Sequence, residues 1–235
     1  MRNYFIFDNT DSRDFGVCIS GSGVYDAPGR TYEEIAVPGR DGIILGYNKR
    51  LENINVMYPA FIYANFSENM ALLRSFLLSK IGYQRLEDSY HPDEYRLAVF
   101  RDAIEAEPTA LLDAGQFELN FFCKPQRFLK LGEQKTTFTS NGTITNPTEC
   151  TAKPLIRIYG NGTVGIGHSQ ITLANTSDYT DVDCDIMEAY NGTNSRNANI
   201  TLQDNDFPTL AAGENGITLG TGITRVEIIP RWWRV

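Results

Sequence analysis

The sequence has few of the residues that usually build an enzyme or metal site. Its 235 residues include two histidines, His91 and His168, and four cysteines that lie far apart and form no C-x-x-C pair. Nucleophilic catalysis, acid–base catalysis and zinc binding depend on such residues occurring in sets with recognisable spacing. We therefore expect a protein that is not an enzyme, with no catalytic residues, no cofactor and no metal site.

Long apolar runs and a leader-like start are also missing. The longest apolar runs are far shorter than the roughly 20 residues that cross a bilayer. Residues Met1 to Tyr4 do not begin a basic-then-apolar leader. We expect no membrane insertion and no export by a signal of the chain's own.

Runs of basic residues are absent, and the formal net charge is −8. A protein that grips nucleic acid needs a concentrated surface of lysine and arginine. The charge therefore argues against specific nucleic-acid binding, although it is compatible with DNA passing nearby.

The cysteines fit the interior of a protein kept in a reducing compartment. Cys184 alternates with Val182 and Ile186, so the three side chains would share one apolar strand face. We expect buried thiols at all four positions: Cys18, Cys123, Cys150 and Cys184.

Composition divides the chain near Glu133. The segment 1–133 holds 3 of the 20 threonines and a net charge of 14 − 19 = −5, whereas 134–235 holds 17 threonines and a net charge of 7 − 10 = −3. Threonine, asparagine and glycine are typical of short strands joined by tight turns. We therefore predict two domains, 1–133 and 134–235.

The first segment reads as a mixed β domain with one helix. Met70, Leu73, Leu77 and Ile81 recur at helical spacing, with Asn65 or Ser67 as the N-cap and Gly82 as the end. The residues Pro38 to Gly42 predict a tight turn. Strands are predicted at Tyr4–Phe7, around Val17 and Ile19, at Thr31–Val37, at Ile54–Tyr58, around Tyr95–Ala106 and at Gln116–Cys123.

The second segment shows only strands, which predicts an antiparallel sandwich. Its end, Phe207 to Val235, reads as a closing hairpin whose two-residue turn is Asn215-Gly216. In the last strand, Val226 and Ile228 are expected to face the core, and Arg225 and Glu227 to face solvent. Other inward pairs are predicted at Ile156 and Ile158, at Ile171 and Leu173, and at Ile200 and Leu202.

Three patterns could carry chemistry, and each also has a structural interpretation. Gly160 to Gly165 matches a dinucleotide fingerprint, but β-branched alternation follows it instead of a helix, so turn glycines are favoured. Asp181, Asp183 and Asp185 could bind calcium, but a solvated strand face is favoured. Four aromatic residues could stack on a sugar, but core or interface packing is favoured: Tyr179, Tyr190, Trp232 and Trp233.

The order and spacing of several segments resemble the distal tail proteins of long, non-contractile-tailed bacteriophages. The resemblance spans nearly the whole chain, although no single element is specific. The segments that carry it are Asp11 to Gly16 after a short opening strand, Pro38 to Gly42, Pro154 to Gly160, Phe207 to Leu210 with Gly213 to Asn215, and Val226 to Arg231.

This resemblance implies a structural virion protein with a ring-forming N-terminal β domain and a C-terminal galectin-like sandwich. It implies a homo-hexamer that joins the tail tube to the tail tip or baseplate and leaves a channel for DNA. The chain would be made in the bacterial host cytoplasm and located in the virion tail. The rival hypothesis is a carbohydrate-binding module that contacts host surface saccharides through the aromatic residues named above.

Overall fold

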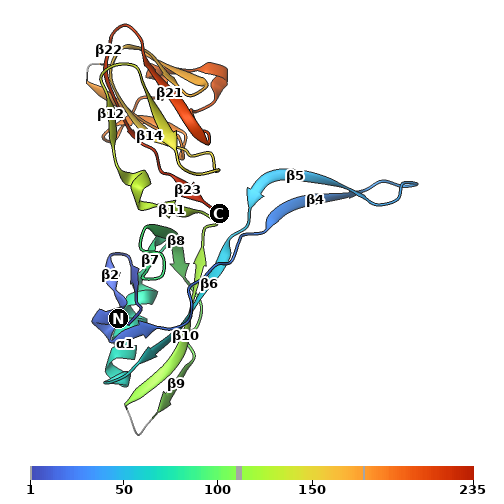
Figure 1. The fold of residues 1–235 in the computed structure, drawn as a ribbon, viewed down its shortest axis with the longest axis vertical. Helices are drawn as coiled ribbons and strands as arrows, with labels where there is room; N and C mark the ends of the chain where they lie inside the picture. The colour runs from blue at the N-terminus through green and yellow to red at the C-terminus, as the bar shows by residue number, and fades with distance from the viewer. Residues whose placement is uncertain (1, 110–112, 177) are drawn as a thin grey trace. The chain divides into compact units, whose positions relative to one another are not determined.

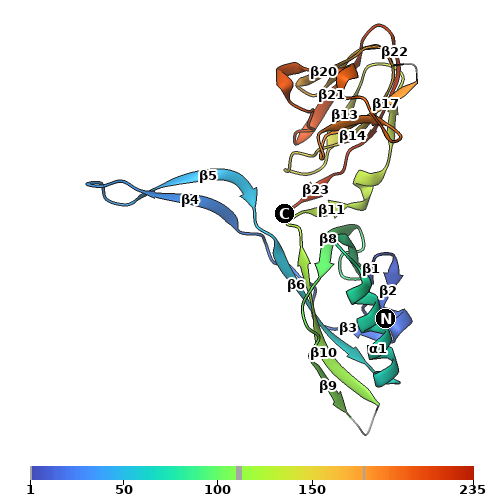
Figure 2. The same cartoon turned by 180° about the vertical axis from the view of Figure 1, so that it is seen from behind.

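The computed structural model describes residues 2–109, 113–176 and 178–235 (Figures 1 and 2). Within them the chain is mainly β-strand with one α-helix, which confirms the predicted fold class. It divides into two compact units, the first ending at Arg127 and the second spanning Phe128–Arg234. Each unit has its own apolar core.

The first unit is built on a curved antiparallel sheet in the order β2-β1-β7-β8-β10-β6-β3, with β9 paired to β10. Burial alternates along β6 and β10, so one face of the sheet is core and the other faces outward. The strands are β1 (Phe5–Phe7), β2 (Thr10–Asp11), β3 (Val17–Ile19), β6 (Ile54–Ile62), β7 (Gln84–Asp88), β8 (Glu94–Phe100), β9 (Ala106–Thr109) and β10 (Ala114–Cys123).

Helix α1 (Phe66–Ser79) packs on this core through Phe66, Met70, Leu73 and Leu77, as the helical spacing predicted. Its first turn is capped from outside the helix, because the N–H of Phe66 donates to the carboxylate of Asp113. The predicted helix end was wrong. Ile81 lies beyond the last turn and is 90% exposed.

A long β-hairpin, β4 (Arg30–Ala36) and β5 (Ile43–Leu51), forms a separate two-stranded sheet (Figure 1). The predicted strand at Thr31–Val37 is confirmed as β4, and the turn that follows it has left-handed φ angles of 76° at Gly39 and 80° at Gly42. Strand β5 was not predicted. We refer to residues 30–51 as the arm.

The second unit is an antiparallel sandwich of two sheets. The six-stranded sheet runs β12 (Thr136–Phe138), β22 (Ile223–Ile229), β14 (Leu155–Gly160), β17 (Tyr179–Asp183), β18 (Glu188–Asn191) and β19 (Asn194–Ser195). The five-stranded sheet runs β13 (Gly142–Asn146), β21 (Gly213–Leu219), β15 (Gly162–Ile166), β16 (Ser169–Leu173) and β20 (Ile200–Leu202).

Shorter elements complete the described chain. The N–H of Leu129 donates to the carbonyl oxygen of Trp232 at 2.9 Å, which holds the end of the chain to the start of the second unit. The short strands are β11 (Arg127–Leu129) and β23 (Trp233–Arg234), and the 3-10 helices are η1 (Ser12–Phe15), η2 (Lys130–Glu133), η3 (Asn197–Asn199) and η4 (Gln203–Asn205).

The predicted closing hairpin is wrong. Asn215 and Gly216 lie inside β21, where they pair with Ile144 and Thr143 of β13. Strands β21 and β22 also belong to different sheets, so the chain crosses the sandwich between them, at a turn that includes Gly222. The amide of the buried Asn215 bonds the backbone of Ala211, which explains its place in a strand.

The strand β22 places Val226 and Ile228 in the core, as predicted. Glu227 was predicted to face solvent but is 8% exposed. Ile186 was predicted to share the core face of Val182 and is 56% exposed, because β17 ends at Asp183 and the chain turns away.

Candidate functional site

The arm exposes a cluster of apolar and aromatic side chains. Seven of its large hydrophobic residues are between 37% and 54% exposed: Tyr32, Ile35, Val37, Ile43, Ile44, Leu45 and Tyr47. Tyr32 and Tyr47 pair across the hairpin with ring centroids 5.5 Å apart, and the Arg30 guanidinium donates to the Tyr47 hydroxyl at 3.1 Å. Clustered apolar exposure of this kind marks an interaction surface.

The arm has no layer packed on either face among the described residues of the first unit, and both views show it projecting away from that unit's sheet (Figures 1 and 2). A two-stranded hairpin is marginally stable in water unless a hydrophobic face is covered. The arm therefore needs a partner surface.

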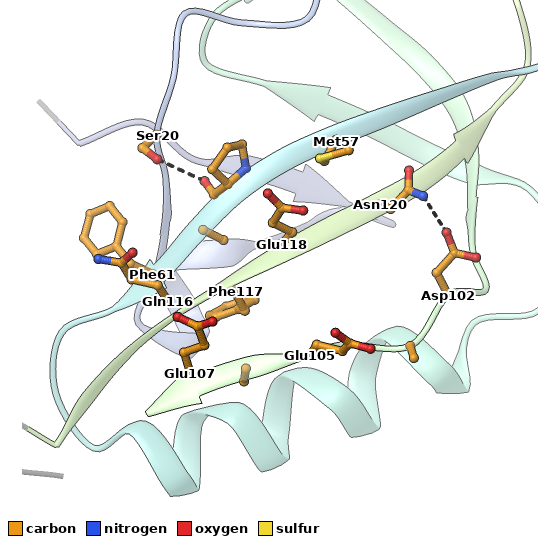
Figure 3. A pocket seen from close by; sticks show the side chains of 14 residues that line it. Ser20, Met57, Phe61, Asp102, Glu105, Glu107, Gln116, Phe117, Glu118 and Asn120 are labelled. Atoms are coloured by element: carbon orange, nitrogen blue, oxygen red, sulfur yellow. Dashed lines mark hydrogen bonds between the residues drawn. The ribbon is translucent and has the colours of Figure 1, made fainter. Parts of the chain in front are cut away.

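A groove of about 920 Å³ lies on the outward face of β6 and β10, bounded by the segment that leads into β9 (Figure 3). Its lining combines the apolar side chains of Met57 and Phe61 with carboxylates. Asp102 accepts a bond from Asn120 at 2.6 Å and lies 4.0 Å from Arg101.

Three further carboxylates in this groove are exposed and have no cationic partner within the described residues: Glu105, Glu107 and Glu118. Glu107 on β9 pairs with Gln116 on β10, Glu118 lies two residues further along β10, and Glu105 directly precedes β9. Neighbouring like charges on a sheet face repel one another. The groove is therefore an acidic surface that a cationic group would stabilise.

The outward face of the six-stranded sheet carries a row of ion pairs. Arg157 on β14 binds Asp181 on β17 with two bonds of 2.7 and 2.8 Å. Glu227, the next residue across from Arg157, contacts Lys135 at 3.0 Å and Arg225 at 3.3 Å. The hydrogen bonds that Arg157 donates to Asp181 raise the pKa of the Arg157 guanidinium.

A second two-bond pair joins Arg231 to Asp183 at 2.7 and 2.8 Å. Burial alone would raise the pKa of the Asp183 carboxyl, but the bonds from Arg231 outweigh it and the pKa is lowered. Arg231 has a left-handed φ of 57°, and its N–H donates to the carbonyl oxygen of Gly132. The ion pair therefore fixes the turn that leads into Trp232.

No protein-family model and no curated protein matches the sequence. Among solved structures, the chain is similar to the Dit (gp 19.1) protein of phage SPP1, described as a paradigm of the hub adsorption apparatus in phages that infect Gram-positive bacteria. The TM-score is 0.74 at 13% sequence identity, and the match covers 100% of both chains. This chain has the Dit fold. The shared fold confirms the resemblance that was inferred from the sequence.

Two further solved structures are similar to this chain, with lower TM-scores. Both are of the phage P2 baseplate in its activated conformation, one with Ca and one with Sr. Each is 12% identical, with TM-scores of 0.52 and 0.51, and each match covers 97% of this chain. In the described part of the chain, no helix is long and apolar enough to span a membrane.

The acidic residues suggested as calcium ligands do not form a solvated face in this Dit-fold chain. Asp181 and Asp183 are 5% and 6% exposed, because arginine side chains cover them. Asp185 lies beyond the strand and is 3.6 Å from Lys153. The described residues contain no group of three or more potential metal ligands.

The four aromatic residues suggested as a sugar platform are not all on one surface. Trp232 is 3% exposed and belongs to the second core, and the Trp233 indole donates to the carbonyl oxygen of Thr151. Tyr179 and Tyr190 lie with the ion pairs on the outward face of the six-stranded sheet, where Tyr179 contacts Arg157. The core interpretation therefore holds for Trp232.

Gly160 and Gly162 flank the one-residue link between β14 and β15, as predicted for turn glycines, whereas Gly165 lies inside β15 and pairs with Gln170. Gly160 has a φ of 104°, and a Cβ there would lie 2.1 Å from the carbonyl oxygen of Gly222. Strand β15 follows directly, so no helix N-terminus points at the glycines. Gly160 and Gly162 let this link approach the turn at Thr221 and Gly222 closely.

The remaining residues considered in the sequence are the four cysteines and His91, and their surroundings are those of structural residues. Cys18, Cys123 and Cys184 are buried as predicted, and burial raises the pKa of the Cys123 and Cys184 thiols to about 12. Cys150 was expected to be buried and is partly exposed.

The His91 ring lies 3.2 Å from the Asp88 carboxylate, which also accepts two backbone N–H groups.

Sequence reasoning missed the arm's second strand and the groove. The apolar run Ile43-Ile44-Leu45, directly after a tight turn and mirroring Thr31–Val37, was the signal for the hairpin. The groove had no such signal. It combines side chains of β6 and β10 that are brought together only by strand pairing.

Proposed function

We propose that this protein is a structural component of a phage tail, a distal tail protein that forms a hub ring between the tail tube and the tail tip or baseplate. The observation that carries the proposal is the fold shared with the SPP1 Dit hub protein over the full length of both chains. In this proposal six copies form the ring, which leaves a channel for DNA.

The arm supports ring assembly. A closed ring requires a heterologous contact, in which one surface of each copy meets a different surface of the next. An exposed apolar hairpin that projects from its own unit supplies one such surface. A monomer that kept this cluster in water would be at risk of aggregation.

We propose different roles for the two parts of the chain. The N-terminal domain, predicted from composition to span 1–133, forms the ring, and the C-terminal sandwich, predicted to span 134–235, contacts neighbouring tail proteins. We assign no catalytic role and no specific nucleic-acid binding. The protein would be made in the host cytoplasm and act in the virion tail.

Imaging of the purified full-length protein by negative-stain electron microscopy tests the proposal, with native mass spectrometry to count the copies. Rings with a central hole and a mass of six chains are expected. Particles of one chain at every concentration, both alone and with the adjacent tail proteins, would contradict it. A glycan array tests the rival function, since defined saccharide binding without rings would favour the carbohydrate-binding module.

A further inference from the structure

We propose that a polar cavity inside the first unit binds one water molecule, which accepts a hydrogen bond from Arg96 and donates one to His91. The cavity is lined by residues of β6, β7, β8, the β7–β8 turn and the start of β11. All of them belong to the first unit, so the inference does not rest on the proposed function or on assembly of the chain into a ring.

Arg96 carries an unpaired donor on the buried face of β8. It pairs across the sheet with Leu86 of β7, and only 8% of its surface is exposed. The Nη1 atom is buried and has no hydrogen-bond partner within the described residues. Burial lowers the pKa of the Arg96 guanidinium, because the charged group loses hydration there. A buried donor without an acceptor is costly, so the cavity favours a ligand that accepts a hydrogen bond.

His91 carries the complementary acceptor. Its Nδ1 atom lies 3.2 Å from Oδ1 of Asp88, and a carboxylate only accepts, so the ring proton is on Nδ1. In the neutral ring the other nitrogen, Nε2, is then an acceptor. This atom is buried and also has no hydrogen-bond partner in the described part of the chain. The ligand must therefore donate to His91 as well as accept from Arg96.

The size and charge of the cavity select water. The cavity leaves about 10 Å³ for the centre of a water molecule, which is room for one. An anion would accept from Arg96 but would meet the lone pair of His91 and the carboxylate of Glu94, which also lines the cavity. A metal cation would meet the charge of Arg96. Among ligands of this size, water is the one that both accepts and donates.

The bound water would connect two parts of a buried polar network. Asp88 joins β6 to the β7–β8 turn, because it accepts from the Tyr58 hydroxyl at 2.7 Å and from the backbone N–H of His91 at 2.8 Å. No direct hydrogen bond from Arg96 to His91 or Asp88 is present among the described residues. A polar network becomes rigid when all of its members are satisfied, and water supplies the missing link to β8.

A crystal structure of the full-length protein, resolved well enough to show ordered water, tests the site directly. One peak is expected within about 3.2 Å of both Nη1 of Arg96 and Nε2 of His91. Crystals soaked in bromide should show no anomalous signal at that position. Absence of the peak, a bromide signal in its place, or a direct bond between the two side chains would each overturn the proposal.

Four variants separate the two hydrogen bonds. Arg96→Met removes the donor, and His91→Asn keeps an N–H group for Asp88 but lacks the Nε2 acceptor, so each should lose the peak. Arg96→Lys and His91→Gln keep a polar atom for the water and should retain it. The matched controls are Arg101→Met and His168→Asn at exposed positions, and both should also retain the peak. A peak that survives both Arg96→Met and His91→Asn would contradict the assigned partners.

A double-mutant cycle gives an independent readout in solution. Because Arg96→Met and His91→Asn displace the same water, the double variant should lose less melting temperature than the sum of the two single losses. His91→Asn combined with Arg101→Met should be additive. Additive losses for the first pair would mean that no water couples the two residues. If either single variant fails to fold, the wild-type crystal structure still decides the proposal.

Discussion

At the scale of single residues, the second unit buries charge on a sheet face that alternation assigned to solvent. Asp181, Asp183 and Glu227 are each less than 10% exposed although they point away from the core. Long cationic side chains cover them, and the guanidinium groups of Arg157 and Arg225 lie over tyrosine rings. Partners on neighbouring strands therefore decide burial here, and alternation alone does not.

Substitutions on the core face of β22 should reduce stability far more than a substitution at its exposed end. Val226→Asp or Ile228→Asp should lower the free energy of unfolding of the second unit by about 3 kcal/mol or more, because an unpaired carboxylate would enter an apolar layer. Thr224→Ser, on the exposed part of the same strand, should change it by less than about 0.5 kcal/mol. Denaturant unfolding of the full chain measures both, and equal effects would mean that β22 is covered on both faces.

The pair of Asp183 and Arg231 predicts a pH dependence. Because the folded-state pKa of Asp183 lies below its ordinary value of 3.8, the unfolded chain binds more protons as the pH falls through that range. The pair's contribution is present above pH 3.8 and is lost as the pH falls through the folded-state pKa. Asp183→Asn should therefore flatten the acid side of a plot of melting temperature against pH.

The matched control for this prediction is Asp185→Asn, since Asp185 is exposed and 3.6 Å from Lys153. It should keep the acid slope of the wild-type protein. If Asp183→Asn leaves the same slope as the control, the bonds to Arg231 do not shift the titration of Asp183.

At the scale of elements, the arm differs from every other strand pair in the first unit. Strands β6 and β10 bury alternate residues against α1 and the sheet, whereas β4 has no fully buried residue. The pairing of β4 with β5 follows from local turn chemistry and alternation. The stability of the arm in the assembled protein would come from a partner surface.

An arm variant should therefore separate folding from assembly. Leu45→Asp replaces a side chain that is 54% exposed, so the melting temperature of the first unit should change little while self-association is lost. Leu72→Asp on α1 has a similar starting exposure of 51% and should leave self-association unchanged. Light scattering across a concentration series measures both, and an unaffected Leu45→Asp variant would remove the arm from the interface.

At the scale of the whole molecule, two units with separate cores share one chain and one overall match to the Dit fold. Identity of 13% over the full length means that the pattern of strands, and not individual residues, is what the two proteins have in common. The function of this chain therefore depends on the surfaces that the fold presents.

Self-association should reside in the first unit. The fragment 134–235, which lacks the arm and the groove, should remain monomeric in light scattering at concentrations where the full chain forms rings. The fragment's circular dichroism should first show a folded β protein, so that loss of association is not loss of structure. A folded fragment that forms rings by itself would transfer the assembly interface to the sandwich.

The sequence by itself determined the elements whose signals are local. Periodicity was enough for α1 and for the inward residues of β14, β16 and β22, because each buries one face against a core whatever the rest of the chain does. Tertiary structure decided the rest. Asn215-Gly216 has the composition of a hairpin turn, yet pairing with β13 holds it in a strand. Likewise, Glu227 is buried only because Lys135 and Arg225 reach it, and such contacts depend on strand order, which no local pattern encodes.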